Sequence, residues 1–286
     1  MKTIGEKDVN RKLKYEKLLS NPKTSLDELQ KFVGEYIPQQ LYRYKAFDKN
    51  GYWKDELLNG KIHLSEPDMF NDPFDSLLRF DFEKLYNDEN VNKEITEYIK
   101  RESQGENSEK ITLTMLKKAE AEAIKNSQKD IAIACFSEAN DSILMWSHYS
   151  DFHKGICIEY NTSNLGTTER SKLYPVLYNT EKFDSTNDLK NHSAIIKINY
   201  ITHKAKEWCY EKEWRVAKKV VKDLDGKKNE SFIEWGKNIS AVYIGVKCEE
   251  NIEDILEWGN QNKIKIYQMK LSNDEYKLKP KLISKF

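Results

Sequence analysis

The sequence predicts an α+β protein whose core is a mixed, largely antiparallel sheet. Apolar segments at strand spacing occur along most of the chain, and helical segments interrupt them without regular alternation. A strict alternation of strands and helices would instead indicate a parallel sheet. No internal repeat or low-complexity tract is present, and 286 residues fit one large domain with appended parts.

The composition limits the classes of function. Charged residues make up 33% of the chain and aromatic residues 12%, with 47 basic against 47 acidic side chains. No global field therefore attracts nucleic acid or membrane. The four cysteines stand singly, which argues against a zinc ribbon or a disulfide framework. No apolar run approaches the ~20 residues of a membrane span, so we expect a cytoplasmic protein without membrane contact.

Two domains are expected. Residues 1–39 predict an N-terminal helical hairpin, with helices over 12–19 and 26–36 separated by Asn-Pro and closed by a second proline. Residues 40–286 predict the α+β domain. Within this domain, two long, charge-rich amphipathic helices predict an inserted helical pair over 83–128.

The other elements follow from apolar spacing and turn residues. Strands are expected at 41–47, 62–65, 131–136, 156–160, 173–178, from 213 or 214 to 221, and at 231–235, 240–246, 263–271 and 276–283. Helical segments are expected at 55–59, around 144–149, from 185 toward 206, and at 251–260.

Residues 131–160 form a strand, a short helix and a second strand that together carry an unusual amount of polar chemistry. Trp146, His148, His153 and Lys154 gather around one tight turn. A plain core hairpin needs aliphatic residues at such positions. We therefore interpret this segment as the floor of a functional site. The two histidines are five residues apart and do not form an i, i+4 metal pair, so one of them fits a satisfied core residue better than a metal ligand.

Two carboxylates precede a late strand. Glu211 and Glu213 are two residues apart, a spacing that places side chains on one face of a strand. One carboxylate could hold a ribose hydroxyl while the other orients an attacking group. The alternative, which stays open, is a ladder of ion pairs with Lys212 and Arg215.

An arginine between tyrosines begins the main body. Arg43, next to Tyr42, suits a phosphate or carboxylate with a ring available for stacking. It could also be a surface arginine on an edge strand. Asp72 and Asp75 lie in a proline-containing turn, where such side chains often cap their own backbone.

Four motifs occur in the order LYRYKAF, LLNGKIHLSEPDMFNDPFD, CFSEANDSILMWSHYSDFHKGICIEY and KEWCYEKEWRV. Between residues 41 and 221 this set resembles the bacterial family of uncharacterised function called DUF2971. The helical hairpin and the inserted helices lie outside the resemblance. The family name implies no activity.

A second resemblance is more distant. An aromatic strand bearing Arg43, a short helix, a strand ending in Ser65 and a late E-x-E are similar to the ADP-ribosyltransferase superfamily, although its Ser-Thr-Ser strand is missing. The resemblance implies that Arg43 grips NAD, Ser65 supports the nicotinamide ribose, Glu213 binds the ribose 2′-hydroxyl and Glu211 positions the acceptor. With His148, these two glutamates are the expected catalytic residues. The expected NAD-binding residues are Arg43, Tyr42, Ser65, Trp146, Tyr149, Lys154 and Arg215.

Three functions remain open. The first is an NAD-consuming ADP-ribosyltransferase-like enzyme, a toxin or phage-defence effector acting on an unknown protein or nucleic-acid acceptor. The second is a metal-dependent nuclease or other hydrolase built from Asp72, Asp75, His148, His153 and Glu159. The third is a nucleotide- or nucleic-acid-binding module without catalysis, lined by Arg43, Trp146, His148, Lys154 and Arg215.

Overall fold

The chain divides into two compact units in the computed structural model. The structure describes residues 4–77, 79–89, 93, 97, 128–221 and 231–285. The first unit comprises 1–32, 66–131 and 177–206, and the second comprises 33–65, 132–176 and 207–286. The expected helical pair at 83–128 lies mostly outside the described residues. None of the described helices is both long enough and apolar enough to cross a membrane.

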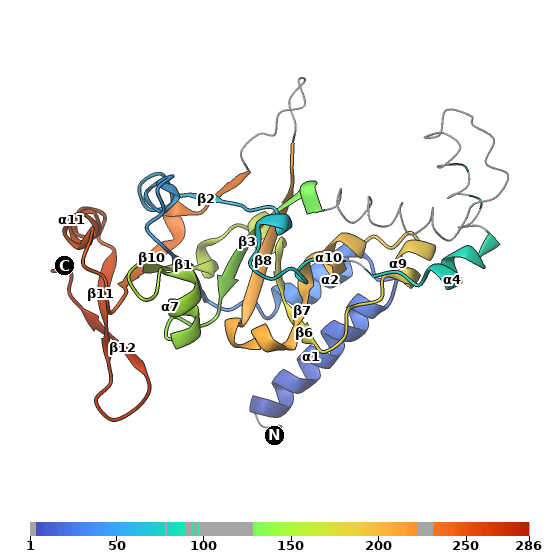
Figure 1. Ribbon diagram of the computed structural model, residues 1–286, viewed down its shortest axis with the longest axis horizontal. Coiled ribbons are helices and arrows are strands. Elements are labelled where there is room, and N and C mark those ends of the chain that lie inside the picture. The colour runs from blue at the N-terminus through green and yellow to red at the C-terminus, as the bar shows by residue number, and fades with distance from the viewer. Residues whose placement is uncertain are drawn as a thin grey trace. The chain divides into compact units, whose positions relative to one another are not determined.

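The second unit is built on an eight-stranded sheet (Figure 1). Its strands, in spatial order, are β12 (Leu278–Leu282), β11 (Lys265–Leu271), β10 (Ile239–Ile244), β4 (Ile156–Asn161), β1 (Gln40–Lys45), β3 (Ile131–Ser137), β8 (Glu213–Lys219) and β5 (Leu173–Pro175). Strands β10 and β11 are parallel, whereas β12 with β11, β10 with β4, β4 with β1, β1 with β3, and β8 with β5 are antiparallel. This architecture confirms the expected mixed, largely antiparallel sheet.

One face of the sheet carries a group of tyrosines and is called here the tyrosine face. Successive strand residues point to opposite faces, so Tyr42 and Tyr44 of β1 share this face. Helix α7 (Ile143–Tyr149) packs against β1 there. The rings of Tyr44 and Trp146 meet edge to face at 5.3 Å, a contact that contributes about 0.5–1.5 kcal/mol beyond area burial.

The opposite face is covered by short helices between β1 and the β2–β9 ribbon, and by a later helix. They are α3 (Tyr52–Lys54), the π-helix η1 (Asp55–Asn59) and α11 (Ile252–Asn262), while β2 (Lys61–His63) pairs with β9 (Phe232–Glu234). Gly259 of α11 lies directly against Ile266 of β11. Phe136 stacks on Trp235 and meets Tyr160 edge to face, so these three rings pack together on this face of the sheet.

Two glycines allow two distant backbone segments to cross. Gly60 ends η1 with a φ of 68°, a conformation that favours glycine. A Cβ atom on Gly60 would lie 2.6 Å from the Cα atom of Gly236, so no other residue fits without backbone movement. The carbonyl of Gly60 accepts hydrogen bonds from the backbone amides of Trp235 and Gly236.

The first unit is mainly helical. It contains α1 (Ile4–Ser20), most of α2 (Leu26–Gly34), η2 (Pro67–Met69), α4 (Phe82–Tyr86), α9 (Thr186–Lys190), α10 (Ile196–Thr202) and the parallel pair β6 (Leu177–Asn179) and β7 (His203–Ala205). Tyr15 stacks on Phe32 between α1 and α2, and Leu19 and Leu29 are fully buried. The two expected N-terminal helices are therefore present.

Four sequence-based element assignments need correction. The strand expected at 173–178 is divided into β5 of the large sheet and β6, which pairs with β7 in a separate two-stranded sheet. The helix expected from 185 toward 206 is broken into α9 and α10, because His192 adopts a left-handed φ of 48°. Strand β2 ends at His63, and Ser65 makes only an isolated bridge with Ile133. Strand β8 ends at Lys219 rather than at 221.

Candidate functional site

A hydrogen bond joins the central segment to the pair of glutamates. Tyr149 at the end of α7 donates its hydroxyl to Oε1 of Glu211 at 2.5 Å. Glu211 ends the 3₁₀ segment η4 (Lys206–Glu211) and is buried. The backbone carbonyl of Glu211 also accepts a hydrogen bond from the hydroxyl of Ser137 on β3. Two segments that are far apart in the sequence are thereby fixed together.

Three rings lie beside this hydrogen bond. His148 stacks over Tyr210 with centroids 6.2 Å apart and meets Trp208 edge to face at 6.3 Å. His148 is exposed, while Trp208 and Tyr210 are half-buried. We call these three residues, together with Tyr149 and Glu211, the aromatic–acidic cluster. Its rings can stack on a planar ligand, and its carboxylate can bind a hydroxyl group.

The spacing of Glu211 and Glu213 predicted that both side chains lie on one face of a strand. This prediction is wrong. Glu211 precedes the strand, and Lys212 between the two acids adopts a left-handed φ of 46°. The alternation of strand side chains therefore begins only at Glu213. Both carboxylate oxygens of Glu213 accept hydrogen bonds from Arg215, at 2.7 and 2.9 Å. The ion pair foreseen as the alternative for Arg215 is thus present, with Glu213 as its partner.

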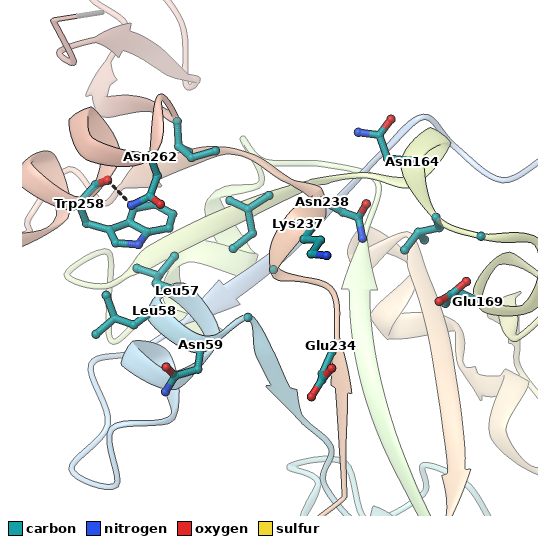
Figure 2. Close-up of a pocket in the computed structure, with 16 residues that line it drawn as sticks. Leu57, Leu58, Asn59, Asn164, Glu169, Glu234, Lys237, Asn238, Trp258 and Asn262 are labelled. Carbon is teal, nitrogen blue, oxygen red and sulfur yellow. Dashed lines mark hydrogen bonds between the residues drawn. The ribbon is translucent and has the colours of Figure 1, made fainter.

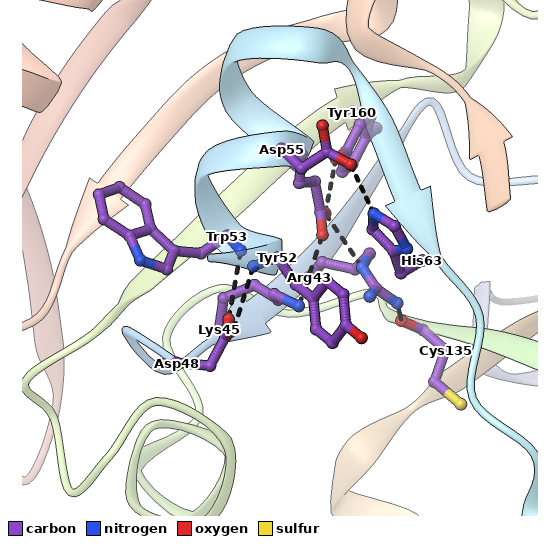
Figure 3. A network of polar contacts seen from close by, with 10 residues as sticks. Arg43, Lys45, Asp48, Tyr52, Trp53, Asp55, His63, Cys135 and Tyr160 are labelled. Carbon is purple, nitrogen blue, oxygen red and sulfur yellow. Dashed lines mark hydrogen bonds and ion pairs between the residues drawn. The ribbon is translucent and has the colours of Figure 1, made fainter. Parts of the chain in front are cut away.

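The guanidinium of Arg43 lies on the other face of the sheet from Tyr42. It donates through Nε to Glu56 at 3.0 Å and through a terminal nitrogen to the carbonyl of Cys135 at 3.1 Å (Figure 3). The ring of Phe136 lies 5.6 Å away. Tyr42 and Tyr149, by contrast, both pack against the core of the tyrosine face. Arg43 therefore lies apart from the aromatic–acidic cluster.

Glu56 is the centre of a buried polar network that the sequence did not reveal. Its Oε1 atom also accepts the hydroxyl of Tyr160 at 2.7 Å, and its Oε2 atom lies 3.8 Å from Nζ of Lys45. Burial lowers the pKa of Lys45, and the ion pair with Glu56 opposes this shift only in part. A solvent-facing acid in a short helical turn has the same sequence pattern, so no local signal identified Glu56.

The tyrosine face carries a carboxylate of its own, that of Glu159. Glu159 accepts hydroxyl hydrogen bonds from Ser240 and Tyr243, both at 2.6 Å. Tyr42 meets Tyr243 edge to face at 6.1 Å. Burial raises the pKa of Tyr42, and the negative charge of Glu159 raises it further. Tyr42 therefore remains a neutral ring and hydrogen-bond donor.

The other expected residues are spread over the second unit. Trp146 is fully buried and donates through Nε1 to the carbonyl of Asn140. Ser65 is exposed, and Lys154 is exposed with Asp151 at 3.9 Å. Of the expected residues, the structure brings His148, Tyr149 and Glu211 together. Trp208 and Tyr210 complete the cluster, and the aromatic spacing of KEWCYE was the only sequence signal for them.

His153 belongs to a strained turn after α7. Asp151, Phe152 and His153 all have positive φ values, of 46°, 54° and 72°. The Nε2 atom of His153 lies 3.0 Å from Oγ of Ser147, and burial followed by the charge of Lys247 lowers its pKa. Within the described ranges, no three histidine, cysteine or acidic side chains are grouped so that they could hold a metal ion.

A separate cavity of about 760 Å³ opens above the Gly60–Gly236 crossing. Figure 2 shows Trp258 on one side of it, and Glu169 and Glu234 on the other. None of the residues expected to bind NAD lines this cavity. It is therefore a different place from the aromatic–acidic cluster.

The comparison with known families agrees with part of the sequence interpretation. Residues 145–216 match the family model described as "Protein of unknown function (DUF2971)". The matched segment begins within α7 and ends within β8, so it contains the whole aromatic–acidic cluster. This match supports the resemblance to that family over this segment. No curated protein and no solved structure matches the chain.

Proposed function

We propose that the protein is an NAD-consuming, ADP-ribosyltransferase-like enzyme whose site is the aromatic–acidic cluster together with Glu213, the first residue of the strand that follows it. The observation that carries the proposal is the hydrogen bond from Tyr149 to Glu211. It joins a carboxylate to the rings of His148, Trp208 and Tyr210, which offer surfaces for nicotinamide or adenine. The carboxylate of Glu211 suits a hydrogen-bond donor on an acceptor molecule.

Cleavage of the nicotinamide bond develops positive charge on the ribose. A fixed carboxylate stabilises such an oxocarbenium-like transition state, as it does in glycoside hydrolysis. Glu213 is the proposed stabilising residue, and Glu211 positions the acceptor. Arg43 is engaged by Glu56 on the other face of the sheet, so the exposed Lys212 is the better candidate for the pyrophosphate.

The test measures release of free nicotinamide from NAD by the whole protein. We expect Glu213→Gln to lower turnover by about 100-fold or more. Because this change leaves Arg215 buried without its carboxylate, the double variant Glu213→Gln/Arg215→Met is measured beside it, with circular dichroism as the check of folding. Glu207→Gln, an exposed acid in η4, is the matched control and keeps full turnover.

Turnover that is unchanged in a folded Glu213 variant removes the proposal. The second candidate is a nucleotide-binding module without catalysis. It is favoured by one observation, that both oxygens of Glu213 are already engaged by Arg215. A thermal shift with NAD or ATP, without any nicotinamide release from the wild-type protein, would support this second function.

A further inference from the structure

Basic charge is concentrated at the end of the chain. Residues 263–285, the basic hairpin, hold seven lysines and two acids, which leaves 40 basic against 45 acidic side chains elsewhere. The neutral total thus conceals a hairpin of net charge +5 and a remainder of −5. We propose that the basic hairpin binds the phosphate backbone of a single-stranded nucleic acid. This inference does not rest on the proposed turnover of NAD.

Three lysines share one face of the basic hairpin. Lys270 of β11 lies directly opposite Lys279 of β12, and Lys281 lies opposite Gln268, two residues along the same face. All three lysines are exposed. None has an acid within ion-pair distance in the described part of the chain. Like charges directly across a strand pair destabilise it, so this face suits an anionic partner.

Protection of the sheet edge explains only part of this pattern. Strand β12 is the edge strand, and lysines on an edge strand discourage pairing with other chains. Lys279 and Lys281 serve that purpose. Lys270, however, lies on the inner strand β11, where edge protection does not need it. The cross-strand Lys270–Lys279 pair is therefore the feature that an anionic ligand explains.

The distribution of apolar side chains favours nucleic acid over a lipid surface. Membrane-binding surfaces place apolar residues beside basic ones. Here the exposed Leu271 and Leu282 are opposite Leu278 and Tyr267, on the other face of the hairpin from the lysines. Tyr276 in the connecting loop is 100% exposed and provides a ring on which a base can stack.

The test is fluorescence anisotropy of labelled 20-nucleotide oligo(dT) and oligo(U) titrated with the full chain between 50 and 200 mM salt. Three phosphate contacts on a single strand contribute a slope of about −2 to the plot of log affinity against log salt. We expect Lys270→Gln/Lys279→Gln/Lys281→Gln to remove this part of the slope and to weaken binding at 50 mM salt at least about tenfold. Tyr276→Ala weakens binding at every salt concentration and leaves the slope unchanged.

The control carries the same change in charge at Lys17, Lys23 and Lys31, which are exposed on or between the N-terminal helices. It binds like the wild-type protein. A urea midpoint of the hairpin variant at or above that of the wild type shows that lost binding is not lost folding. Equal losses in both triple variants, no binding by the wild type, or binding to phosphatidylserine vesicles in place of oligonucleotides would each overturn the proposal.

Discussion

At the scale of single residues, the buried carboxylate of Glu56 decides what Arg43 does. An acid that is 0% exposed is stable only with compensating partners, and here these are Arg43, Tyr160 and Lys45 (Figure 3). The sequence indicated that Arg43 needs an anion. It could not indicate that the anion is thirteen positions away in the same chain, since this depends on how η1 packs on β1.

The Arg43–Glu56 pair can be tested by a double-mutant cycle in urea. Arg43→Met is expected to cost about 3–5 kcal/mol of unfolding free energy, because it leaves the buried Glu56 carboxylate with only the hydroxyl of Tyr160 and the more distant Lys45. The double variant Arg43→Met/Glu56→Leu is expected to cost less than the sum of the single variants. The surface pair Lys12–Glu16 is the control, with a coupling of about 0.5 kcal/mol or less. Additive effects at Arg43 and Glu56 would contradict this account.

The sequence predicted which segments contribute to the candidate site, but it did not predict how their side chains are arranged. The polar content of residues 131–160 and the E-x-E motif both marked segments that contribute to the aromatic–acidic cluster. The spacing of Glu211 and Glu213 was misleading, however, because strand alternation was assumed across Lys212, whose left-handed conformation interrupts it. A single positive φ at a lysine has no reliable signal in one sequence.

At the scale of elements, most strands lie where apolar spacing placed them, since each has one face in the core. The helix expected from 185 toward 206 was wrong for a local reason. The run Asn191-His192-Ser193 is a turn signal, and it ends α9 before α10 begins. The spatial order of the strands could not be predicted, because β4 lies between β1 and β10 through contacts distant in sequence.

The crossing of Gly60 and Gly236 gives a test at this scale. Gly51 and Gly60 have similar positive φ values, of 75° and 68°, but only Gly60 has a backbone neighbour in the space of a Cβ atom. Gly51→Ala is expected to cost about 1–2 kcal/mol of unfolding free energy through its backbone conformation alone. Gly60→Ala is expected to cost about 2 kcal/mol more, because Gly236 must move. Urea denaturation measures the unfolding free energy of both variants. Equal losses would show that the backbone at Gly236 moves away from a Cβ atom at little cost.

At the scale of the whole molecule, the four cysteines report on how the chain is packed. All four are free, with Cys209 exposed, Cys135 half-buried, and Cys157 and Cys248 buried. Burial raises the pKa of Cys157, which lowers its thiolate fraction as well as its accessibility.

Titration with a chromogenic disulfide reagent should therefore resolve the thiols. We expect one fast thiol, from Cys209, and reaction of Cys157 and Cys248 that is at least about tenfold slower. All four thiols react together once urea unfolds the chain, and Cys209→Ser removes the fast phase. A fast phase that survives this substitution would mean that a second cysteine is accessible in the folded protein.

The contact between Gly60 and Gly236 also restricts how the sequence can diverge. Each of these positions occupies the volume that a side chain at the other would require, so neither can acquire a Cβ atom while the backbones stay at their present separation. Substitution here has to wait for a prior shift of the main chain. The end of η1 and the start of η5 (Gly236–Asn238) are consequently tied in their evolution, although two segments of the first unit, 66–131 and 177–206, lie between them along the polypeptide.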